Sequence, residues 1–172
     1  MSQTATTLTD TGELAGKYLT FHLGDEVFGI EILKVREIIG LMDITRVPRT
    51  PENIRGVINL RGKIIAVVDL RAKFAMEPAP DTEQTCIIVV DVQTPDGIYH
   101  SGILVDGVSE VRGIEADQIE PAPSFGAGVD SGFIRAIAKC DRHVAILLNI
   151  ERVLDTSRLP DSGQADQQEP AS

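Results

Sequence analysis

The fold is decided by a stretch in the first half of the chain, Gly56-Val57-Ile58-Asn59-Leu60-Arg61-Gly62-Lys63-Ile64-Ile65-Ala66-Val67-Val68-Asp69. Two apolar runs, Val57–Leu60 and Lys63–Leu70, flank the dipeptide Arg61-Gly62. Their Val and Ile content favours strands, and the glycine accepts the positive φ of a tight two-residue turn. The stretch therefore predicts a β-hairpin with Arg61 at its tip.

Three further hairpins are predicted from similar patterns. Their paired strands are Lys17–Leu23 with Val27–Ile30, Cys86–Val92 with Ile98–Val105, and Phe133–Ala138 with Val144–Ile150. The first pair turns at Gly24-Asp25, the second is joined by a loop at Gln93–Gly97, and the third turns at Cys140–Arg142. Most of the chain is therefore expected to be β-structure.

Helical segments are expected to be short. Apolar residues recur at three- and four-residue spacing in Ile32–Ile39, which predicts a short helix or one mixed turn there. Further short helical segments are expected near Glu52–Arg55, at Arg71–Phe74 and at Glu151–Leu154. None is long enough to build a helical layer.

The two halves of the chain echo each other. Gly29–Ile38 aligns with Gly102–Val111, and Ile64–Asp69 aligns with Val144–Asn149. A small sheet leaves open edges unless it closes, so the echo predicts two β-barrels of about five strands each. One barrel of about 70 residues has a marginal core. We therefore expect two barrels that share an apolar layer and act as one folding unit, with a groove where they meet.

Charge and composition limit the possible partners. The 172 residues have a formal net charge of -10, which disfavours nucleic acid and anionic membrane surfaces. No apolar run reaches the roughly 18 residues of a membrane span, and no signal peptide is recognisable. We expect a cytoplasmic protein without direct membrane insertion. The polar ends, residues 1–16 and 158–172, are predicted to be disordered tails around a domain at 17–157.

The sequence predicts no catalytic residue, no metal site and no cofactor. His22, His100 and His143 fall in different predicted strands or turns, and no P-loop, GxSxG, GxGxxG or HExxH motif occurs. Cys86 and Cys140 lie far apart, and each is interpreted as a small buried hydrophobe rather than as a disulfide or a zinc ligand.

Two charged side chains stand out against this apolar scaffold. Arg61 is at a hairpin tip, and Glu37 is near the end of the Ile32–Ile39 segment. Each also has a simpler interpretation: Arg61 as a solvated turn arginine, and Glu37 as part of a solvated helix face. Together they are candidates for the charged rim of an apolar groove, as partner-binding surfaces often have.

The stretch Gly56–Gly62, running on to Val68-Asp69-Leu70-Arg71, resembles the chemotaxis coupling protein family, also described as CheW-like. Further matches are Phe28–Ile38, Val105–Val111, and Pro121-Ala122-Pro123 followed by Phe125. They occur in family order and cover nearly all of residues 17–155. The Asn-Leu-Arg-Gly hairpin together with the Val-Asp-Gly-Val-Ser segment is specific, whereas either alone is weak.

The resemblance implies a mainly β fold of two intertwined SH3-like five-stranded barrels with short helices. It also implies a non-catalytic adaptor that joins the cytoplasmic tip of a chemotaxis receptor to the regulatory domain of a chemotaxis histidine kinase. Such adaptors are recruited to membrane receptor arrays through these partners, and the arrays can include further copies of the adaptor. The residues implied to face the receptor are Val35, Glu37, Arg61 and Val111, and those implied to face the kinase are Ile64 and Phe125.

Two positions depart from the family pattern. Ala66 stands where a proline is common, which we expect to alter a strand detail only. Glu120 stands where a basic residue can occur, which changes the expected charge pattern beside Phe125.

Two other function classes fit the sequence less well. A small-ligand-binding protein or enzyme using the inter-barrel groove would need convergent polar groups in one pocket, and none is recognisable. A nucleic-acid-binding barrel would need positive charge and an aromatic stacking strip, which this acidic chain lacks.

Overall fold

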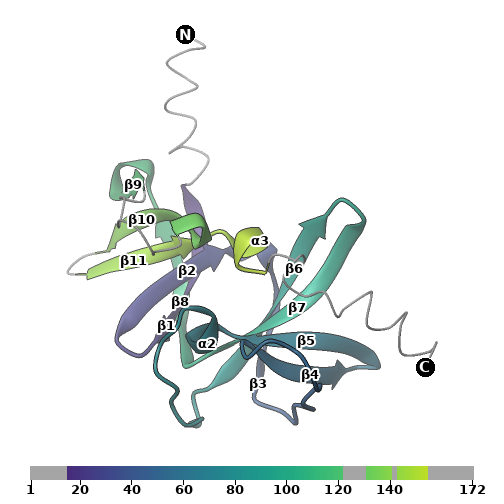
Figure 1. Cartoon of the computed structure of the whole chain (residues 1–172). Helices are drawn as coiled ribbons and strands as arrows, with labels where there is room; N and C mark the ends of the chain where they lie inside the picture. Colours follow the sequence, from purple (N-terminus) through teal and green to yellow (C-terminus); the bar gives the residue numbers. More distant parts are fainter. Residues whose placement is uncertain (1–14, 122–130, 141–142, 155–172) are drawn as a thin grey trace.

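The structure is a computed structural model that describes residues 15–121, 131–140 and 143–154 (Figure 1). Its strands are β1 (Gly16–Leu23), β2 (Glu26–Glu31), β3 (Val35–Gly40), β4 (Ile54–Leu60), β5 (Lys63–Asp69), β6 (Cys86–Thr94), β7 (Gly97–Val105), β8 (Gly107–Ile114), β9 (Ile119–Pro121), β10 (Ile134–Cys140) and β11 (His143–Leu148). Its short helical segments are η1 (Ile32–Lys34), α2 (Leu70–Lys73), η2 (Ala116–Gln118), η3 (Ser131–Phe133) and α3 (Ile150–Val153). In these ranges no helix is long and apolar enough to cross a membrane.

The strands form two sheets, which we call barrel one and barrel two. Barrel one has the order β8-β1-β2-β11-β10-β9, and barrel two has the order β3-β6-β7-β5-β4. The predicted mainly β fold of two packed SH3-like barrels is confirmed. Barrel one has one strand more than the five expected, because the short β9 pairs with β10.

Both barrels close by the same device. In barrel two the chain leaves the edge strand β3 and returns to the other edge, where Thr45 and Val57 exchange two backbone hydrogen bonds of 2.8 Å. In barrel one the chain leaves the edge strand β8, passes through η2 and becomes β9, which pairs with β10 at Pro121 and Ala136. Closure removes the open sheet edges on which the prediction of barrels rested.

The barrels are not the two halves of the sequence. Strand β3 follows β2 in the chain but pairs with β6 in barrel two, whereas β8 follows β7 but pairs with β1 in barrel one. Each barrel also contains one parallel pair, β2 with β11 and β5 with β7. Gly29 lies opposite Leu147 in the first pair, and Gly102 lies opposite Val67 in the second. The two halves of the sequence therefore have the same topology, and they exchange their third strands, β3 and β8.

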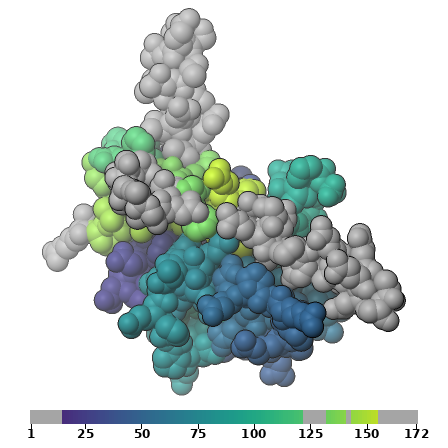
Figure 2. Space-filling model, viewed as in Figure 1, coloured from purple at the N-terminus to yellow at the C-terminus, as the bar shows by residue number. Residues whose placement is uncertain are grey.

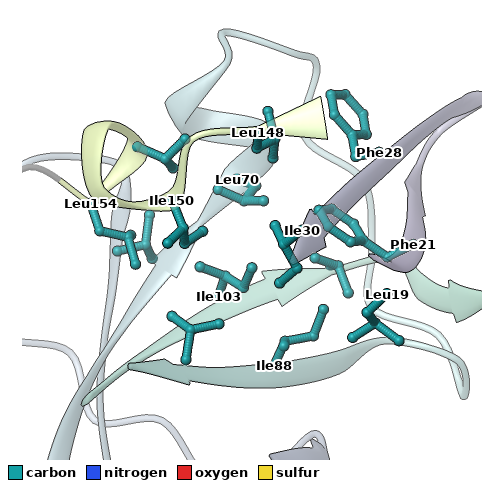
Figure 3. Close-up of a cluster of buried hydrophobic side chains, with 14 of the residues drawn as sticks. Leu19, Phe21, Phe28, Ile30, Leu70, Ile88, Ile103, Leu148, Ile150 and Leu154 are labelled. Atoms are coloured by element: carbon teal, nitrogen blue, oxygen red, sulfur yellow. The ribbon is translucent and has the colours of Figure 1, made fainter. Parts of the chain in front are cut away.

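Three apolar clusters hold the domain together. One lies within barrel one around Tyr18 and Leu147, and one lies within barrel two around Ile58 and Val67. The largest combines residues of both barrels with residues at the short helices α2 and α3, and Figure 3 shows part of it. Its labelled members are Leu19, Phe21, Phe28, Ile30, Leu70, Ile88, Ile103, Leu148, Ile150 and Leu154. This shared cluster is the apolar layer that two small barrels need, because each alone has little core.

A row of phenylalanine rings extends the contact between the barrels. Phe28 stacks on Phe21 and on Phe74, with ring centroids 5.7 and 5.6 Å apart. Phe74, which follows α2, also lies 5.8 Å from Phe133. Aromatic pairs at such distances add to the energy of area burial. The row therefore fixes α2 against the strands of barrel one.

Several local expectations were wrong in detail. The segment Ile32–Ile39 is one 3-10 turn followed by strand β3, because pairing with β6 places Ile38 opposite Ile88 and overrides the helical spacing. Near Glu52–Arg55 a single turn occurs, and β4 already begins at Ile54. The loop at Gln93–Gly97 is tighter than expected, since β6 and β7 pair as far as Thr94 and Gly97. Strands β8 and β9 were not predicted.

The expected tails lie almost entirely outside the described residues. The N-terminal tail was expected at residues 1–16, and Gly16 of this range is the first residue of β1. The C-terminal tail at 158–172 and the turn at residues 141–142 are also outside the described ranges.

Candidate interaction site

The β4–β5 hairpin presents Arg61 as predicted. Arg61 and Gly62 form its turn with φ values of +54° and +89°. The Gly62 N–H donates a 2.8 Å hydrogen bond to Oδ1 of Asn59, which fixes the turn from within. A turn with two positive φ values matches the twist of the flanking strands. The Arg61 side chain is consequently held out from the hairpin and is 71% exposed.

Arg61 pairs with Glu37 across the closure of barrel two. Its Nη1 atom donates to both carboxylate oxygens of Glu37, at 2.9 and 3.0 Å. Glu37 lies on β3, and Arg61 follows β4, so the pair joins strands at opposite ends of the sheet order. An exposed ion pair contributes only about 0–1 kcal/mol to stability. We conclude that it orients the guanidinium more than it stabilises the fold.

Exposed apolar side chains lie on the same barrel. Ile64 on β5 is 65% exposed and lies opposite Asn59, within the hairpin that carries Arg61. Ile38 follows Glu37 on β3 and is 44% exposed. Isolated exposed apolar residues are common, but here Ile64 belongs to the same hairpin as the oriented charge of Arg61. Apolar area beside charged groups is the composition of a partner-binding surface.

The remaining receptor-facing candidates lie on the edge strands of the two sheet orders. Val35 is the first residue of β3, is half-buried and packs against the shared cluster. Val111 is on β8, opposite Leu19 of β1, and is half-exposed. The structure therefore brings Glu37 and Arg61 into direct contact and places the two valines on equivalent edge strands of the two barrels. Phe125, the second kinase-facing candidate, lies outside the described residues.

A clamp between the barrels was missed by the sequence analysis. Asp106, between β7 and β8, accepts hydrogen bonds from Nε and Nη2 of Arg71, at 3.0 Å to Oδ1 and 2.5 Å to Oδ2. Its Oδ2 atom also accepts a 2.7 Å hydrogen bond from the N–H of Gly24, in the β1–β2 turn. These bonds, above all those from Arg71, hold the pKa of Asp106 below its usual range.

The clamp ties α2 of barrel two to the first hairpin of barrel one. Arg71 belongs to α2 after β5, whereas Gly24 belongs to the first hairpin of barrel one. The Arg71 and Asp106 side chains are only 16% and 27% exposed, so their attraction is less screened by water than that of a surface pair. Hydrogen bonding to Asp106 in turn raises the pKa of Arg71. No local pattern could reveal this contact, because 35 residues separate its partners.

The histidines and cysteines do not converge on one site. His22 is on β1, His143 is on β11, and His100 is on β7 with its Nδ1 atom 2.8 Å from Oδ1 of Asp91. Within the described ranges, no group of three or more His, Cys, Asp or Glu side chains could hold a metal ion. Cys140 is buried, as predicted, whereas Cys86 is half-buried and its thiol pKa is raised by burial.

The two residues that depart from the family pattern, Ala66 and Glu120, both lie within strands. Ala66 lies in the middle of β5, opposite Val57. Glu120 on β9 forms an ion pair with Lys139 on β10, with Oε2 and Nζ 2.9 Å apart. The negative charge at position 120 is thus paired within barrel one.

Comparison with known proteins identifies a family and several relatives. The family model described as a CheW-like domain matches residues 17–158. The protein named Chemotaxis protein CheW from Klebsiella aerogenes is 39% identical over 160 residues, which cover 92% of this chain and 94% of that protein. A probable chemotaxis protein CheW from Rhizobium etli is 35% identical, with 77% of this chain and 83% of that protein covered. The crystal structure of the scaffolding protein TtCheW from Thermoanaerobacter tengcongensis superposes with a TM-score of 0.73 and 35% identity, and covers 82% of this chain and 93% of that one.

Proposed function

The chain belongs to the CheW-like family of chemotaxis adaptors, and we propose that it couples chemotaxis receptors to a chemotaxis histidine kinase. The observation that carries this proposal is the Glu37–Arg61 pair, which presents an oriented guanidinium beside exposed apolar side chains. A surface of this kind binds a protein through a few anchors surrounded by a polar rim. The activity is non-catalytic and works by bringing two partners together.

The receptor face in this proposal consists of Val35, Glu37, Arg61 and Val111. Arg61 supplies a directed charge, and the two valines supply apolar contacts for the cytoplasmic tip of the receptor. Loss of one such anchor typically costs about 2 kcal/mol, or roughly thirtyfold in Kd. The half-buried carboxylate of Glu37 acts mainly on Arg61, because it accepts both hydrogen bonds that hold the guanidinium in place.

The kinase face consists of Ile64 and Phe125 and binds the regulatory domain of the kinase. The exposure of Ile64 supports its assignment, since a β-branched side chain that is 65% exposed gains from burial against a partner. Further copies of the adaptor join the same arrays. We place the adaptor domain at residues 17–157, in the cytoplasm, where it reaches the membrane only through its partners and binds no nucleic acid.

Binding of the purified chain to a receptor signalling fragment and to a kinase regulatory domain tests this proposal. We expect Arg61→Ala to weaken receptor binding about thirtyfold and to leave kinase binding unchanged. Ile64→Ser is expected to weaken kinase binding and to leave receptor binding unchanged. Lys17→Ala, at an exposed position on β1, is the control and should leave both affinities unchanged.

Two results would contradict the proposal. If Arg61→Ala lowers both affinities together with the melting temperature, the residue acts on folding and not on recognition. If wild type binds neither partner, the adaptor function fails, and the inter-barrel groove should then be screened for small ligands.

A further inference from the structure

The segment of residues 46–63 has a charge opposite to that of the protein; it runs from the loop between β3 and β4 through β4 to the first residue of β5. It contains five of the sixteen Lys and Arg residues and a single acidic residue, Glu52, although the whole chain carries a net charge of -10. The loop part of this segment lies on the surface, within the region coloured blue in Figure 2. Apart from Arg61, the segment contains no residue assigned above to the receptor or the kinase.

The loop is held in place at both ends. Thr45 and Val57 exchange two backbone hydrogen bonds of 2.8 Å where barrel two closes. Further along, the N–H of Asp69 donates a 2.7 Å bond to the carbonyl of Asn53. Two prolines, at positions 48 and 51, restrict the backbone between these points. A loop fixed in this way presents its side chains without a large loss of entropy on binding.

Two arginines of the loop have no counter-charge. Arg46 and Arg49 are exposed and line a surface hollow, and among the residues that the structure describes neither guanidinium has an ion-pair or hydrogen-bond partner. Arg55, which also lines the hollow, is by contrast already paired with Asp81 at 2.8 Å. The backbone of Arg49 has a φ of +67°, an unfavourable value for a residue with a side chain. Such conformations are found preferentially at binding sites.

We propose that this hollow binds an acidic peptide segment of a partner protein, with Arg46 and Arg49 pairing with its carboxylates. The planar guanidinium matches a carboxylate through two parallel hydrogen bonds. Val47, Pro48 and Ile54 also line the hollow and offer contacts for aliphatic side chains of a peptide. The site is additional to receptor and kinase coupling and does not depend on it.

Fluorescence anisotropy with a labelled octapeptide of alternating Glu and Ala tests the site on the full chain. Its counterpart of alternating Gln and Ala has the same length without the charge. We expect the Glu peptide to bind and the Gln peptide not to bind. Arg46→Gln and Arg49→Gln should each raise the Kd about tenfold, since each removes the charge-assisted pairing of one guanidinium with a carboxylate of the peptide. The matched control, Arg152→Gln, removes an exposed arginine outside the hollow and should change the Kd less than twofold.

The following results would contradict the proposed acidic-peptide site. Equal binding of the Gln peptide would show that charge is not recognised. An equal loss with Arg152→Gln would show that only the overall charge matters. Tighter binding of a single-stranded DNA octamer than of the Glu peptide would reassign the hollow to nucleic acid. Because Arg46 and Arg49 are exposed, thermal unfolding of both variants should match wild type, and a large shift would assign the arginines to folding.

Discussion

Replacement of Gly56 by alanine should open barrel two. A Cβ atom at this position would lie 2.3 Å from the carbonyl oxygen of Thr45 and 2.7 Å from Cγ2 of Ile44. The obstacle is backbone that is itself tied to Val57 by two hydrogen bonds of 2.8 Å, so no flexible side chain can move to relieve the contact. The residue also has a φ of +151°, which a side chain disfavours.

The magnitude follows from these contacts. To reach an ordinary carbon–oxygen contact distance from the new Cβ atom, the Thr45 backbone must move away by about 1 Å. This movement takes both Thr45–Val57 bonds beyond hydrogen-bonding distance. Two lost bonds cost about 2 kcal/mol, and the strained backbone adds about 1–3 kcal/mol. The total of about 3–5 kcal/mol is a large part of the 5–15 kcal/mol typical of a domain. It corresponds to a fall of roughly 10–15 °C in melting temperature.

Urea and thermal unfolding, followed by circular dichroism, measure this change. The matched control is Gly40→Ala, at the end of β3, where an added Cβ meets no atom within 4 Å. Its free energy of unfolding should stay within about 1 kcal/mol of wild type. A Gly56→Ala protein within about 1 kcal/mol of wild type, or an equal loss in the control, would refute the role of this contact in closure.

Three other changes have defined outcomes. Asp106→Asn should lower the free energy of unfolding by about 2 kcal/mol at pH 7, because Arg71 loses its charged partner. The folded pKa of Asp106 is depressed, so its contribution is fully present above the unfolded pKa of about 3.8 and is lost as the pH falls from there through the lower folded pKa. The difference between variant and wild type should therefore shrink as the pH falls below about 3.8, whereas a constant difference would contradict this. Gly102→Ala places a Cβ 2.8 Å from Cγ2 of the buried Ile87 and should cost about 1–3 kcal/mol in urea unfolding, while Gly113→Ala, with open space, should cost little. Deletion of residues 158–172 should leave the melting temperature nearly unchanged, and a large drop in a thermal scan would show that this segment docks on the domain.

The hairpins could be predicted because their signals are local. Asn59, Arg61 and Gly62 determine a tight turn within four residues, and the Val and Ile runs on either side have the composition of strands. The candidate residue Arg61 was identified from the same segment, whereas Ile64 was implied only by the family resemblance. The spacing in Ile32–Ile39 misled the prediction, because pairing of β3 with β6 decides that segment and the partner strand lies about 50 residues away.

The sequence by itself determined the strand content, the hairpin tips, the internal echo and the family. Only the tertiary structure decided that the halves exchange β3 and β8, that Thr45 closes barrel two against Val57, and that Arg71 clamps Asp106. The physical reason is that a turn or a strand depends on neighbouring residues, whereas sheet order and ion pairs depend on which distant surfaces can be buried together. The Glu37–Arg61 pair shows both levels, because the sequence presents each charge and the closed barrel brings them within 2.9 Å.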